Sequence, residues 1–134
     1  MTDFQTVSKK GATKALKNTQ KRDLSTELQA YELSPQKLEE IALHKSFPWI
    51  RPDHMKPTGT ADLAQVQRDF LQHMQTCQAV LDQLPNGEGV LYKTSMSVND
   101  IGKLDVYQYI LFLARHAQRH VQQMKHVVKE WEQN

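Results

Sequence analysis

The sequence has little cysteine, glycine or proline, with counts of one, five and five among 134 residues. The single Cys77 cannot form an intrachain disulfide, which excludes a disulfide-stapled scaffold and agrees with a reducing cytoplasm, where we expect the protein to lie. No apolar run approaches the length of a membrane span, so we expect no membrane partner. Gly-rich phosphate loops, Ser-nucleophile motifs and Cys-x-x-Cys pairs are also missing.

A large excess of charge of one sign is missing too, because the formal net charge is only +2. Residues 1–24 nevertheless carry six basic residues against two acidic ones, without interleaved aromatic side chains. This composition indicates a solvated basic segment, and we expect no nucleic-acid partner. The interpretation divides the chain into a basic N-terminal arm over 1–23, a frayed helix or mobile segment, and a helical bundle domain over 24–134.

The clearest helix signal lies between Asp105 and Trp131. Asp105 and Gln108 have the spacing of a capping box, and Leu104 and Tyr109 have that of a hydrophobic staple. No glycine or proline follows, and one face carries an apolar stripe at helical spacing: Val106, Tyr109, Leu113, Met124, Val127 and Trp131. The pattern predicts one long amphipathic helix.

A second long helix is expected over Ala61–Leu84, capped by Thr60. Its stripe is Leu63, Val66, Phe70, Met74, Cys77, Leu81 and Leu84. A shorter helix should begin at Ser34-Pro35, and residues 47–52, with two prolines, should be extended over the core. Residues 85–104 show no strand alternation and are expected to form a long loop. The predicted fold class is therefore all-α, a helical bundle.

Two amphipathic helices cannot fully bury their stripes against each other. Either residues 24–52 fold back and close a monomer, with Trp49 as the plug, or a second chain completes the core. We predict the second arrangement, a homodimer that makes a four-helix core.

His116 and His120 lie inside the apolar stripe as a His-x-x-x-His pair, which puts both imidazoles on one helix face. Three interpretations stay open: ligands of a divalent metal, hydrogen-bonded core histidines, and an acid–base role without metal. A metal needs another ligand, for which His73 is the first candidate. Gln123 is placed to orient a ligand. His44 and then His54 are the next candidates for the additional metal ligand, whereas His126 lies off the stripe and is expected in solvent.

The C-terminal part of the chain resembles the DinB-like family of four-helix-bundle proteins, named for a DNA-damage-inducible protein. The resemblance covers roughly residues 47–128 and is carried by Pro57-x-Gly59, the stretch 101–109 (IGKLDVYQY), Phe112, His116, Arg119-His120 and Gln123. It implies a divalent metal, often zinc or nickel, held by three histidines, of which two correspond to His116 and His120. The family's third histidine follows a Trp-Ser-like helix start that this sequence does not contain, and residues 1–45 stand where the family has its first two helices.

The resemblance also implies an activity, a metal-dependent transferase or hydrolase whose substrate the sequence does not identify. The alternative is a non-enzymatic, truncated relative that acts as a helical dimer or interaction module without a complete metal site. The sequence leaves open whether the protein is an enzyme.

Overall fold

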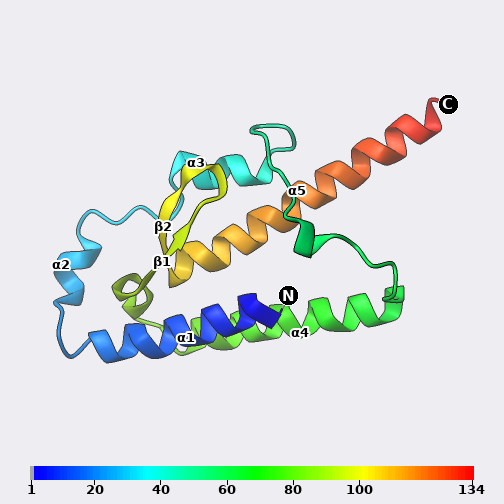
Figure 1. Ribbon diagram of the computed structural model, residues 1–134. Coiled ribbons are helices and arrows are strands. Elements are labelled where there is room, and N and C mark those ends of the chain that lie inside the picture. Colours follow the sequence, from blue (N-terminus) through cyan, green and yellow to red (C-terminus); the bar gives the residue numbers. More distant parts are fainter. Residues whose placement is uncertain (1) are drawn as a thin grey trace.

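The computed structural model describes residues 2–134, with the backbone alone for residues 2–6. It is mostly helical, with 63% of residues in helices and a small two-stranded hairpin (Figure 1). The long helices are α1 (Thr2–Asn18), α4 (Leu63–Asp82) and α5 (Val106–Glu132). The shorter elements are α2 (Leu24–Leu28), α3 (Gln36–Glu39), β1 (Lys93–Met96), β2 (Gly102–Asp105) and the 3₁₀ turns η1 (Glu40–Ala42), η2 (Asp53–Met55), η3 (Glu88–Leu91) and η4 (Val98–Asp100).

Helix α5 begins as its local sequence predicts. The Gln108 backbone N–H donates to Asp105 Oδ1 at 3.0 Å, and the Asp105 N–H donates to Gln108 Oε1 at 3.1 Å. Leu104 and Tyr109 are buried in the same core cluster, as the staple requires. The capping box is therefore confirmed, and it fixes where the helix leaves β2.

The start of α4 differs from the prediction. Asp62 is the N-cap and accepts from the Gln65 N–H at 2.7 Å, whereas the predicted cap, Thr60, forms a hydrogen bond with Thr58. A carboxylate is a stronger acceptor than a hydroxyl, so the later cap prevails. At α3, similarly, Pro35 occupies the N-cap position predicted for Ser34.

The loop predicted over residues 85–104 contains a hairpin, so the all-α prediction holds only for the rest of the fold. Strands β1 and β2 pair antiparallel, with Lys93 opposite Asp105 and Met96 opposite Gly102. Four residues are too few to show a clear alternation, and β1 is largely polar. The turn uses left-handed backbone at Asn99, with φ 53°, and at Gly102, with φ 92°.

The N-terminal segment, expected to be frayed or mobile, is helix α1. Its Ala12 and Ala15 are fully buried, with 0% of their surface accessible to solvent. They belong to a core cluster with Val80 of α4 and Val106 of α5. The segment has few large apolar side chains, but alanines make the contact here, because small side chains let helix backbones approach closely. Helix α1 therefore joins the two long helices at one end.

Beyond this junction α4 and α5 separate, and the C-terminal half of α5 projects from the rest of the chain (Figure 1). The stripe predicted for α5 is buried at Val106 and Tyr109, whereas Met124 is 60% and Trp131 80% exposed. The N-terminal half of α4 is similar, with Phe70 50% exposed. Both predicted stripes exist, but each is part of the core over only half its length.

Candidate functional site

The two histidines of the His-x-x-x-His pair face each other on α5. Their Nε2 atoms are 2.8 Å apart and their ring centroids 4.6 Å apart. Residues four apart on a helix are neighbours on its surface, so the helix itself sets this approach. The pair lies where the covered half of α5 gives way to the exposed half.

His116 is the covered member of the pair. Its ring lies 4.6 Å from the Trp49 ring and 6.1 Å from the Phe112 ring, centroid to centroid. Burial lowers the pKa of His116 to about 4, and electrostatic interactions with His120 and Arg119 act in the same direction. At neutral pH this imidazole is uncharged, which is the form that donates a lone pair to a metal.

His120 is the exposed member, and Gln123 holds it. His120 Nδ1 and Gln123 Oε1 are 2.8 Å apart. Because a carbonyl oxygen accepts hydrogen bonds, Nδ1 carries the proton and His120 Nε2 keeps its lone pair. His116 Nε2 then donates to that lone pair. Gln123, expected from the sequence to orient a ligand, is thus in contact with one of the two histidines.

Arg119 is the residue of this region that the sequence reasoning missed as a structural element. It is only 5% exposed, and its guanidinium donates to the Leu43 carbonyl at 2.8 Å and to the Phe47 carbonyl at 3.4 Å. Its charged carbon lies 4.6 Å from the Phe47 ring centroid and 5.3 Å from that of Trp49. Arg119 therefore anchors the segment that places Trp49 on His116.

The other histidines lie apart from the pair. His44 approaches His126, with ring centroids 5.8 Å apart, and His126 Nε2 is 3.1 Å from a Glu130 carboxylate oxygen. His54 is in the exposed turn η2, and His73 is on α4. Within the described part of the chain, no group of three or more His, Cys, Asp or Glu side chains is placed to hold a metal ion. The side chains that the structure describes therefore bring no third ligand to His116 and His120.

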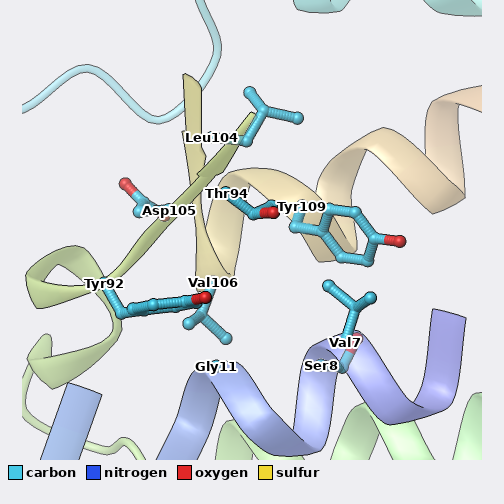
Figure 2. A pocket seen from close by; sticks show the side chains of 9 residues that line it. All are labelled: Val7, Ser8, Gly11, Tyr92, Thr94, Leu104, Asp105, Val106 and Tyr109. Carbon is cyan, nitrogen blue, oxygen red and sulfur yellow. The ribbon is translucent and has the colours of Figure 1, made fainter. Parts of the chain in front are cut away.

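One small cavity among the described residues is too small to be a substrate site. It measures about 10 Å³ and lies between α1, the hairpin and the start of α5 (Figure 2). Figure 2 shows Val7 and Ser8 of α1 on one side, with Tyr92, Val106 and Tyr109 across from them. A space of this size holds at most about one water molecule.

Fold and site together define a mostly helical protein that presents two convergent imidazoles at the rim of its core. The sequence matches no protein-family model, and comparisons with curated proteins and with solved structures gave no match. Over the described residues, no helix is both long and apolar enough to span a membrane.

Proposed function

We propose that this protein is a DinB-like metal-binding protein in which His116 and His120 ligate one divalent ion. The observation that carries the proposal is the 2.8 Å approach of their two Nε2 atoms. Two ligands bound to one ion bring their donor atoms to about 3 Å from each other, given metal–nitrogen distances near 2 Å. Without a metal ion, a hydrogen bond between the two Nε2 atoms holds them at a similar separation.

The surrounding residues fit such an ion. Imidazole nitrogens are ligands that suit zinc or nickel. Gln123 keeps the His120 proton on Nδ1, the arrangement that outer partners of metal-bound histidines usually impose. Trp49 and Phe112 fix the ring of His116 and shield it from water. The exposed side of His120 leaves room for further ligands and for a substrate.

The proposed activity is a metal-dependent transfer or hydrolysis. A divalent ion lowers the pKa of a thiol or water bound to it, and so supplies a nucleophile near neutral pH. The chain's own contribution is to hold His116 uncharged at neutral pH and to orient both imidazoles beside an open surface. The substrate is left unassigned, because two imidazoles select a metal ion and not a substrate.

A second candidate is a non-enzymatic helical interaction module. Two observations favour it: no third ligand lies beside the pair within the described residues, and both long helices expose apolar side chains. In that case His116 and His120 form a hydrogen-bonded pair that links the covered and exposed halves of α5.

Metal content separates the two candidates. Protein purified without a histidine tag is loaded with zinc or nickel, dialysed, and analysed for bound metal. We expect about one ion per chain, lost in His116→Ala and in His120→Ala. His126→Ala is the matched control on the same helix, since His126 is directed toward His44, and it should retain the metal. Less than about a tenth of an equivalent, with no uptake on reconstitution, favours the interaction module.

A further inference from the structure

The exposed halves of α4 and α5 form two apolar surfaces, defined here as the α4 face and the α5 face. Each side chain in them is between 44% and 80% exposed. The α4 face comprises Leu63, Val66, Phe70, Leu71 and Met74, and the α5 face comprises Val121, Met124, Val127, Val128 and Trp131. We propose that a second copy of this chain covers both faces, and that the partner's His73 completes the site at His116 and His120. The second part rests on the proposed metal function.

The area of the two faces is sufficient for a stable dimer. Ten large side chains exposed to this degree present on the order of 1,000 Å² per chain, or about 2,000 Å² for a pair, the size class of stable interfaces. Each face alone, at about 500 Å², is no larger than the largest apolar patch of an ordinary monomer, so what favours a partner is the presence of two such faces on one chain. Their summed area suits a dimer that covers both faces at once.

Closure within one chain is opposed by α1. Ala12 and Ala15 of α1 are buried against Val80 and Leu84 of α4 and Val106 of α5, and this cluster sets the separation of the two long helices. Bringing the α4 face onto the α5 face of the same chain would require displacing these contacts. A second copy can cover both faces without displacing these contacts, because the side chains it would cover are exposed.

The two faces have matching lengths. The α4 face extends eleven positions, from Leu63 to Met74, and the α5 face ten, from Val121 to Trp131, so they span about 16 Å and about 15 Å. In an antiparallel pairing the partner's Leu63 lies level with Trp131, and the partner's Met74 lies level with His120. The partner's His73 is then level with Val121, within one residue of His120.

The histidines also lie on matching sides of the two apolar faces. At about 100° per residue, His73 lies on one flank of the α4 face, and His116 and Gln123 lie on the corresponding flank of the α5 face. Reversing one helix relative to another brings corresponding flanks together, so the partner's His73 comes to the side on which His116 and His120 lie. Leu71 and Val121 meet on the other flank.

A two-fold axis uses both faces of both chains at once. Helix α4 of each copy covers α5 of the other, so the interface is closed and leaves no apolar face unmatched. The assembly contains two sites, each with two histidines from one chain and one from its partner. Three imidazoles and an open position are the ligand set of many catalytic zinc sites.

The first test is the mass of the full chain by sedimentation equilibrium at low micromolar concentration. We expect a species of twice the 15.5 kDa chain mass. Phe70→Glu and Met124→Glu should each give a folded monomer, judged by far-UV circular dichroism. Ile50→Glu is the matched control, because Ile50 is 86% exposed but outside both faces, and it should stay dimeric. A wild-type chain that is folded and monomeric overturns the proposal.

The second test asks which chain supplies the third ligand. His73→Ala should remain dimeric and lose at least about tenfold in zinc affinity, whereas His54→Ala should not change it. The double variant His116→Ala/His120→Ala should also bind no zinc. Mixing it with His73→Ala chains, after dissociation and reassociation, should restore about a quarter of the wild-type sites, since random pairing makes half the dimers mixed, with one complete site each.

The outcomes distinguish the two proposals. A dimer that takes up no metal refutes the proposed function and leaves the interface standing. A monomer that binds metal refutes the interface and leaves the function standing. A dimer that binds metal without recovery in the mixture, and without an effect of His73→Ala, overturns the assignment of His73.

Discussion

The two halves of helix α5 differ in what covers them, although one apolar stripe runs through both. From Val106 to Arg119 the helix is packed against α1, β2 and the segment around Ile41 to Trp49. From His120 onward its apolar side chains are exposed. The comparison teaches that periodicity establishes which side of a helix is apolar, but not what lies against it. The histidine pair occupies the boundary, with one ring in each environment.

The largest expected difference between the halves is in the response to truncation. Phe112→Ala should lower the free energy of unfolding by about 3–5 kcal/mol, because the side chain is 2% exposed and packs in the central cluster. Val127→Ala should change it by less than about 0.5 kcal/mol when measured on a monomeric variant such as Met124→Glu. Urea denaturation followed by circular dichroism measures both. Similar losses at the two positions would show that the C-terminal half is covered within the chain.

The next effect concerns the anchor that separates the halves. Arg119→Met should cost about 2–3 kcal/mol, since it removes charge-assisted hydrogen bonds and leaves buried carbonyl oxygens unpaired. In a Trp131→Phe background, the emission of Trp49 should move to longer wavelength as its segment loosens. Arg115→Met is the control, because its ion pair with Glu39 is half exposed and contributes at most about 1 kcal/mol. An unshifted emission in Arg119→Met would contradict the anchoring role.

A smaller, pH-dependent effect comes from His116 in metal-free protein. Its folded pKa is about 4, below the usual value of 6.5, so between these values the unfolded chain binds more protons than the folded one. Stability is therefore full above about pH 6.5 and decreases as the pH falls toward 4. Denaturation at a series of pH values should show this slope, reduced in His116→Phe. An identical slope in the variant would assign the effect to other groups, such as His44, whose pKa burial also lowers.

What the sequence could predict was local. The capping box at Asp105 and Gln108 depends on residues three apart, and the meeting of His116 and His120 depends on a single helical turn; the structure has both. The hairpin escaped prediction because each strand has four residues and one is largely polar. The strength of an N-cap is also a local property, yet the cap of α4 was predicted wrongly: Thr60 was expected, and the structure has Asp62.

What the sequence could not predict depends on contacts between distant segments. Ala12 and Ala15 carry no hydrophobic signal comparable to leucine, yet they are the point where three helices meet. Arg119 looks like a surface cation in any helical wheel, and its burial follows only from the carbonyl oxygens that residues 41–47 bring to it. The identity of a third metal ligand is equally hard to predict from the sequence, because it depends on how an α4 helix lies relative to α5. That placement is what the dimer experiments measure.

The smallest expected effect compares the starts of the two long helices. Asp105→Ala should cost about 1–2 kcal/mol, because Asp105 is 1% exposed and its cap is reciprocated by Gln108. Asp62→Ala should cost about 0.5 kcal/mol, since that cap is exposed and water can replace the carboxylate. The asparagine variants at both positions keep the acceptor and should retain most of the stability. Urea denaturation of the four variants in the Met124→Glu monomer measures the differences without dissociation. If Asp62→Ala proved the costlier change, the start of α4 would have to be covered, and the α4 face could not be open to a partner in the way its 73% exposed Leu63 indicates.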